Sequence, residues 1–289
     1  MKMIKYVIFL TVIFSFRNLY AVKPYSEQMS NFSAAVSVTV IPNTNFTEYK
    51  YEIVYSQNNP RDLFALSFNF PPQIVESEFL NAEGLAEDGV KWNGSYGNFG
   101  NLSIINFGAK GGTLSREWIN SNMILQKYSA NLKPGQKLLI SIKVSGKQTI
   151  PGIINLEGYC NAAHWVFNTK KDGYPDKTYD TGVHPKIFKV VGPMLKPAGN
   201  TGMIDKLIEL TTGSYDLQWI SKMDVYLGLM DKLNAAKQQI LQGQSKYHTA
   251  WNILEAYKHL LNAQRWKAIT EPCFQMLYFN ADLLISKLK

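Results

Sequence analysis

The chain ends in three apolar stripes at helical spacing, separated by two short breaks, within residues 224–289. Residues three or four positions apart share one face of an α-helix, so each stripe predicts an amphipathic helix. Isolated helices of this length are only marginally stable in water, so the stripes must bury against one another or against the rest of the protein. The two clearest stripes consist of Ala250, Ile253, Leu254, Tyr257, Leu260 and Leu261, and of Phe274, Leu277, Tyr278, Ala281, Leu284, Ile285 and Leu288.

The preceding residues, 22–191, have a different pattern. Apolar and polar side chains alternate there with a period of two, which is typical of strands with one buried face. Turn residues separate the runs, and no helical period intervenes. We therefore expect an antiparallel β-sandwich of the Ig-like type, enlarged by insertions and followed by a three-helix module in residues 203–289. The clearest alternating runs are 36–40, 49–55, 64–70 and 138–144.

Two stretches have compositions that resist regular structure. Residues 192–200 contain two prolines and two glycines, so we place a linker at 192–202. Residues 93–112 contain six glycines, which indicates either a loop or a glycine-rich pair of strands. After the linker, residues 203–210 predict a short helix that packs on the bundle or on the sandwich.

The first 21 residues have the pattern of a signal peptide. Lys2 and Lys5 precede an uncharged apolar run over residues 6–16. This run is shorter than the roughly 20 residues that a spanning helix needs, and Ala21 suits a cleavage site. We expect a secreted or periplasmic protein that is not integral to the membrane; the alternative is an uncleaved anchor.

The charge of the chain argues against nucleic-acid binding. Residues 1–21 contain three basic residues and no acidic one, so their removal lowers the formal net charge from +8 to +5. The remaining basic residues are scattered, whereas a nucleic-acid interface would gather them on one face.

The chain has two cysteines, Cys160 and Cys273. Export would permit a disulfide between them. Such a bond would close a long loop and stabilise the fold by about 4–5 kcal/mol in the chain-entropy model. The alternative is two buried free thiols.

Signatures of catalysis and of metal binding are scarce. The sequence contains no G-x-S-x-G, H-E-x-x-H or P-loop motif, and its four histidines do not have metal-ligand spacing. Asp172, Asp176 and Asp180 lie in a polar segment whose carboxylates could hold Ca²⁺. Their spacing of four does not match an EF-hand loop, which favours a solvated turn. We predict no catalytic residue, no cofactor and no metal site.

Four aromatic residues are candidate ligand contacts. Trp92, Tyr96 and Phe99 alternate with glycine, asparagine and serine, a composition that suits a stacking platform for sugars or peptides. The alternative is that their rings cap one end of the sandwich core. Trp266 stands outside the helical stripes, at the break before the last helix.

Residues 224–288 resemble the FIMAH domain, a small helical module of secreted bacterial proteins. The resemblance rests on the Ala-Gln-Arg element at 263–265, on Ile269 and Thr270 after it, and on Gly243 at the first break. Trp266 replaces the small residue usual in the family. The resemblance implies secretion by a bacterium and an accessory or interaction role, and it supplies no catalytic residues. More weakly, the β region is similar to exported bacterial sandwich domains through residues 131–136 and 151–153.

These observations favour an exported bacterial protein with a binding or structural role and an unidentified protein or glycan partner. One alternative is a secreted glycan hydrolase that uses two carboxylates of the β region about 5 Å apart. Another is a component of a surface assembly that is docked by its helices. The carboxylates available for hydrolysis are Glu76, Glu78, Glu83, Glu87, Asp88, Glu117 and Glu157.

Overall fold

The computed structural model describes residues 33–289 except 44, 60–61, 72–73, 100–101, 112–113, 121–122, 147, 161–162, 170–174 and 181–185. The predicted signal peptide lies outside the described residues. Within them, no helix combines the length and the hydropathy that a membrane span requires.

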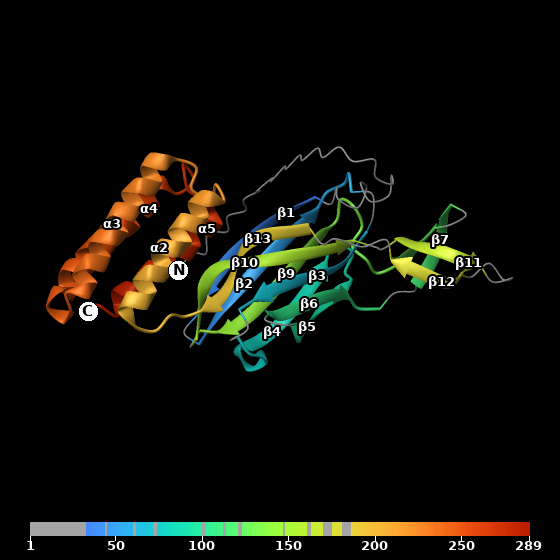
Figure 1. Ribbon diagram of the computed structural model, residues 1–289, viewed down its shortest axis with the longest axis horizontal. Coiled ribbons are helices and arrows are strands. Elements are labelled where there is room, and N and C mark those ends of the chain that lie inside the picture. The colour runs from blue at the N-terminus through green and yellow to red at the C-terminus, as the bar shows by residue number, and fades with distance from the viewer. Residues whose placement is uncertain are drawn as a thin grey trace.

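Nine antiparallel strands form the main sheet, in the order β1-β2-β9-β4-β5-β6-β3-β10-β13 (Figure 1). Each predicted alternating run lies in one of these strands, so the period-two prediction is confirmed. The strands are β1 (Ala34–Pro42), β2 (Phe46–Tyr55), β3 (Leu63–Phe70), β4 (Phe79–Ala86), β5 (Lys91–Phe99), β6 (Leu102–Ala109), β9 (Lys137–Ser145), β10 (Thr149–Cys160) and β13 (Lys186–Leu195).

The sheet curls until it is nearly closed and barrel-like, rather than dividing into the two sheets of an Ig-like sandwich. Its edge strands β1 and β13 contact each other. The Tyr51 hydroxyl on β2 donates a hydrogen bond to the Val191 carbonyl on β13 over 2.9 Å. The sandwich prediction was wrong because a period of two gives each strand one buried face, and a curled sheet satisfies that condition as well as two facing sheets do.

The inside of the curl is the hydrophobic core. Phe68 lies at its centre, with ring centroids 4.7 Å from Tyr51 and 5.6 Å from Phe107. Among the described residues, the largest fully buried rings are Trp92, Tyr49, Tyr51, Tyr55, Phe68, Phe70 and Phe107 of the sheet and Tyr257 of the helices.

The glycine-rich stretch is a pair of strands, β5 and β6, which is one of the two forms expected from the sequence. Gly94 permits the close approach of β4 and β5. A Cβ at this position would lie 2.6 Å from the Cβ of Ala82 and 2.9 Å from its carbonyl oxygen, which is closer than real Cβ contacts.

Two insertions form a second, smaller sheet with the order β12-β11-β8-β7. The first insertion lies between β6 and β9 and the second between β10 and β13, and they join where β8 pairs with β11. This sheet lies at the end of the molecule opposite the helices (Figure 1). Its strands are β7 (Leu114–Asn120), β8 (Met123–Tyr128), β11 (Ala163–Thr169) and β12 (Pro175–Asp180).

The C-terminal module has four long helices, not three. The expected short helix at 203–210 is part of α2 (Gly199–Asp216), which precedes the three helices that the stripes predict. All the members of the two clearest stripes are buried except Ile253, Leu260 and Tyr278, which are partly buried. The other helices are α3 (Met223–Leu241), α4 (Tyr247–Gln264) and α5 (Glu271–Ser286), with two single 3₁₀ turns, η1 (Glu76–Glu78) and η2 (Gln244–Lys246).

The predicted linker at 192–202 is largely regular structure, because β13 extends to Leu195 and α2 begins at Gly199. Gly192 serves close packing rather than flexibility. A Cβ there would lie 2.2 Å from Ile154 and 3.1 Å from the Tyr51 hydroxyl. Pro193 is tolerated because β13 is an edge strand. The break between the sheet and the helices, residues 196–198, thus lies inside the predicted range and is shorter than it.

Helix α5 covers the seam where the sheet almost closes. The Gln275 side chain accepts a hydrogen bond from the backbone N–H of Val40 on β1 at 2.9 Å. The Asn280 amide donates to the Pro151 carbonyl on β10 at 2.8 Å. Edge strands otherwise present unpaired backbone groups to water and to other chains. The helical stripes are therefore buried partly within the bundle and partly against the sheet, in one continuous core.

Candidate functional site

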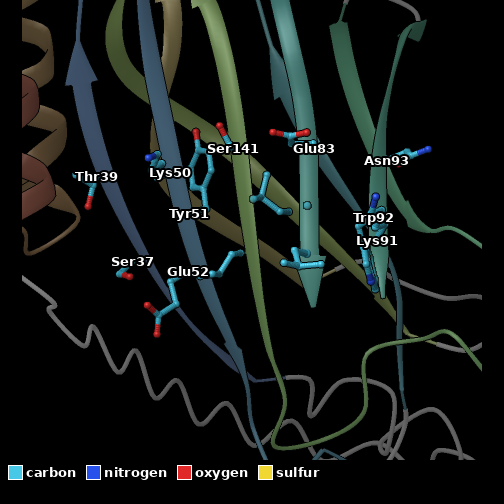
Figure 2. A pocket seen from close by; sticks show the side chains of 14 residues that line it. Ser37, Thr39, Lys50, Tyr51, Glu52, Glu83, Lys91, Trp92, Asn93 and Ser141 are labelled. Atoms are coloured by element: carbon cyan, nitrogen blue, oxygen red, sulfur yellow. The ribbon is translucent and has the colours of Figure 1, made fainter. Parts of the chain in front are cut away.

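A groove of about 550 Å³ lies on the outer face of five neighbouring strands, β1, β2, β9, β4 and β5 (Figure 2). The backbone of Tyr51, Ile140, Gly84 and Trp92 forms its floor. The side chains of Tyr51, Ile140 and Trp92 turn inward to the core and are buried, and Gly84 has no side chain. Side chains alternate along a strand, so the residues on either side of the floor point outward and form the two walls.

The first wall is polar. We call it the polar row: its members stand opposite one another across four strand pairings. With neighbouring strands about 4.8 Å apart, the row is roughly 19 Å long. The polar row consists of Thr39, Lys50, Ser141, Glu83 and Asn93, in the spatial order of the strands from β1 to β5.

The second wall, which we call the leucine row, is apolar at its centre. Leu139 and Leu85 stand opposite each other on β9 and β4 and are 53% and 49% exposed. The two walls are two residues apart along each strand, or roughly 7 Å. The leucine row consists of Ser37, Glu52, Leu139, Leu85 and Lys91, again from β1 to β5.

The charges of the groove differ between its ends. On β2, Lys50 lies 3.6 Å from Glu48, and Glu52 lies 3.5 Å from Lys137. At the β4–β5 end, Glu83 and Lys91 form no ion pair with any described residue. This end therefore presents one carboxylate and one ammonium group, on opposite walls, to a ligand.

The aromatic platform predicted from Trp92 and Tyr96 is not formed. Trp92 is fully buried, and its indole N–H has no hydrogen-bond partner among the described residues. The half-buried Tyr96 donates to the Ile74 carbonyl at 3.3 Å, and its ring packs 5.6 Å from Phe79. Both rings belong to the core, as in the alternative interpretation. The side chain of Phe99 lies outside the described structure.

Trp266 is 49% exposed and lies in the turn between α4 and α5, in the helical module and not at the groove. Its backbone has a positive φ of 69°, which is uncommon for a residue with a side chain. The Arg265 guanidinium lies 5.2 Å from this ring, and it forms an ion pair with the buried carboxylate of Glu271. The turn is thus held by its own contacts, and the exposed ring remains a candidate contact there.

The predicted disulfide is not formed, because Cys273 is a free, buried thiol. Burial raises the pKa of this thiol to about 12, partly offset by the neighbouring Ser214 hydroxyl. Cys160 ends β10, roughly 30 Å along that strand from Pro151, where α5 is attached. Cys160 is therefore at the end of β10 far from this contact, whereas Cys273 lies in α5.

The weak calcium candidate lies largely outside the described structure. Asp172 is outside it altogether, and only the backbone of Asp176 and Asp180, in β12, is placed. Within the part of the chain that the structure describes, no group of three or more histidine, cysteine, aspartate or glutamate side chains gathers in a metal-binding arrangement.

Three of the carboxylates proposed for hydrolysis are hydrogen-bonded to different groups of the protein. Glu87 accepts from the Lys137 N–H at 3.2 Å, Asp88 from the Val90 N–H at 3.1 Å, and Glu157 from the Asn69 amide at 2.6 Å. Each of these three thus takes part in a different structural contact. Glu76 and Glu78 lie in η1, and the side chain of Glu117 lies outside the described structure.

Only Glu83 of that set lines the groove. The other carboxylate there, Glu52, is two strands and two residues away, so the Cα atoms are roughly 12 Å apart. Its ion pair with Lys137 is on the side away from Glu83. The register therefore provides no close carboxylate pair in the groove.

Sequence reasoning missed most of the groove. The alternating pattern of residues 49–55 places Lys50 and Glu52 on the solvent face of a strand and indicates nothing more. No sequence pattern singles out Leu85 or Lys91 as part of a site. The pattern of each strand shows which residues point outward, but it does not tell which strands are neighbours. No protein-family model and no curated protein matches the chain.

Proposed function

We propose that this chain is an exported bacterial binding protein without a catalytic role, and that the groove holds an elongated ligand across five strands. The observation that carries the proposal is the arrangement of its walls: two rows in register, an exposed leucine pair at the centre, and Glu83 and Lys91, which form no ion pair within the described part of the chain.

Two features of the sequence support the exported setting. Residues 1–21 have the composition of a signal peptide. Residues 224–288, which include most of α3 and all of α4 and α5, resemble in sequence the FIMAH domain, which accompanies secreted enzymes and binding modules.

The chemistry of the walls suits binding. Covering the leucine pair removes apolar surface from water, which contributes about 25 cal/mol for each Å². The hydroxyls of Thr39 and Ser141 and the amide of Asn93 can give a ligand its orientation through hydrogen bonds.

The proposal is tested with an immobilised panel of synthetic peptides and oligosaccharides, probed with the protein and two variants. Leu85→Arg places a charged side chain in the groove. It should lower the affinity for any probe that binds the unmodified protein at least tenfold. Ile187→Arg is the matched control, because Ile187 is 52% exposed on β13, outside the groove.

The proposal is supported if an immobilised probe binds the unmodified protein and the Ile187→Arg variant but does not bind the Leu85→Arg variant. The proposal is refuted if every probe binds all three proteins equally, or if no probe binds the unmodified protein. Circular dichroism and the melting temperature establish that each variant is folded.

A further inference from the structure

The ligand class follows from how the two walls are spaced. Along the groove, neighbouring wall positions are roughly 4.8 Å apart, and the walls are roughly 7 Å apart. An extended polypeptide advances about 3.4 Å per residue and directs successive side chains to opposite sides. Such a chain in the groove presents alternate side chains to the polar row and to the leucine row.

The positions of the individual wall residues fix an order of side chains. Measured from β1, Leu139 lies at roughly 10 Å, Leu85 and Glu83 at roughly 14 Å, and Lys91 at roughly 19 Å. An aliphatic side chain between the two leucines sits at roughly 12 Å. The next residue, at about 15 Å, faces Glu83 on the opposite wall, and the one after it, at about 19 Å, faces Lys91.

A glycan fits these walls less well. Sugar rings commonly stack on exposed aromatic side chains, and the aromatic residues that line the groove, Tyr51 and Trp92, are buried. The leucine pair instead offers a contact for one branched aliphatic side chain, and Glu83 and Lys91 offer one charge of each sign. These are the side-chain types of a polypeptide.

We infer that the groove binds an extended polypeptide segment in which aliphatic, basic and acidic side chains occupy three consecutive positions, ordered from β9 towards β5. This inference rests on the proposed function, because it names the ligand of the same groove. The walls set the spatial order and do not set the chain direction. A segment of either direction satisfies them, as leucine–lysine–glutamate or as glutamate–lysine–leucine.

The test uses fluorescein-labelled hexapeptides with blocked ends, which carry one of these two triads between alanine and serine residues. In the two control peptides lysine and glutamate are exchanged, so composition and net charge are unchanged. Fluorescence anisotropy measures the affinity of the full chain for all four. We expect at least one triad peptide to bind roughly tenfold more tightly than its exchanged control, because two exposed charge contacts change sign together.

The decisive variant exchanges the two charges of the groove, Glu83→Lys together with Lys91→Glu. Both side chains are exposed, so the fold should be unaffected. The variant should prefer the exchanged peptides by a similar factor. Equal affinity for both kinds of peptide, or an unchanged preference in the double variant, would overturn the peptide assignment.

The immobilised panel of peptides and oligosaccharides described above separates this inference from the proposed function. Binding of an oligosaccharide that is lost with Leu85→Arg, without binding of any peptide, would retain the groove as the site and reject the polypeptide. If Leu85→Arg abolishes binding to none of the probes, both the polypeptide inference and the proposed function are rejected.

Discussion

Two tyrosines of β2 provide a matched test of how the sheet closes. Tyr49 and Tyr51 are two residues apart, and both are fully buried. The Tyr51 hydroxyl donates to the Val191 carbonyl of β13, whereas the Tyr49 hydroxyl has no hydrogen-bond partner among the described residues. Replacement by phenylalanine removes the same oxygen atom from each site.

The two replacements should have different effects on the free energy of unfolding. Tyr51→Phe removes a buried hydrogen bond and leaves the Val191 carbonyl without this donor, which costs about 1–2 kcal/mol. Tyr49→Phe removes a hydroxyl that was desolvated without compensation, so its effect should lie between neutral and a stabilisation of about 1 kcal/mol. The expected difference between the variants is therefore about 2 kcal/mol.

Urea unfolding, followed by tryptophan fluorescence and by circular dichroism, measures this difference. Coincident transitions would justify two-state treatment, and equal m-values would show that the variants expose similar surface. If both variants lose the same stability, or if Tyr49→Phe is the more destabilising, the Tyr51 hydroxyl does not link β2 to β13 as described.

Three further predictions concern the seam, the last turn and the buried thiol. Asn280→Ala should lower the free energy of unfolding by about 1–3 kcal/mol, because the buried Pro151 carbonyl loses its amide donor; an unchanged urea midpoint would contradict this role. Arg265→Ala should cost about 3–5 kcal/mol, because it leaves the buried Glu271 carboxylate without its ion-pair partner; a loss below 1 kcal/mol in thermal or urea unfolding would argue against it. Because burial raises the Cys273 pKa from 9.0 to about 12, unfolding should become easier as the pH rises from 9 towards 12, since the unfolded thiol ionises first. Cys273→Ala should lessen this loss, and the same alkaline slope in both proteins would count against the linkage.

The strands of the fold could be predicted from the sequence, and their order could not. Tyr49, Tyr51, Ile53 and Tyr55 alternate with smaller or polar neighbours, and burial of the tyrosines and Ile53 follows directly. By contrast, β9 lies between β2 and β4, although it is far from both in the chain. This arrangement depends on how all nine strands fill one interior, and no local pattern records it.

Helix α2 shows how tertiary contacts override local preference. Its second half contains Thr211, Gly213 and Ser214, which are poor helix formers, and the sequence predicted only residues 203–210. In the structure, the Thr211 hydroxyl donates to the Leu207 carbonyl and lies 3.1 Å from the Tyr257 hydroxyl of α4. The contact with Tyr257, on a distant helix, thus lies in the part of α2 that the local pattern does not predict.

Trp92 failed as a predicted ligand contact for a similar reason. Its glycine and asparagine neighbours suggest a loop, and a tryptophan in a loop is commonly exposed. Gly94 and, on the neighbouring strand, Gly84 instead permit close strand packing. A Cβ on Gly94 would lie 2.6 Å from the Cβ of Ala82, and one on Gly84 would lie 3.0 Å from the Cβ of Trp92. The ring consequently fills the core, and only the backbone of this residue reaches the groove.

The helical module and the groove are connected through strand β1. Arg265 pairs with Glu271, Glu271 accepts from the Gln275 amide at 2.9 Å, and the Gln275 carbonyl accepts from the Val40 N–H. Val40 adjoins Thr39, the first member of the polar row. A slip of β1 by one residue would turn Val38 and Val40 outward and Thr39 inward, because side chains alternate across a strand. The chain of contacts from the last turn to the edge of the sheet therefore holds β1 in register, and β1 forms one end of both walls. Through these contacts the helical module helps to position the walls of the groove.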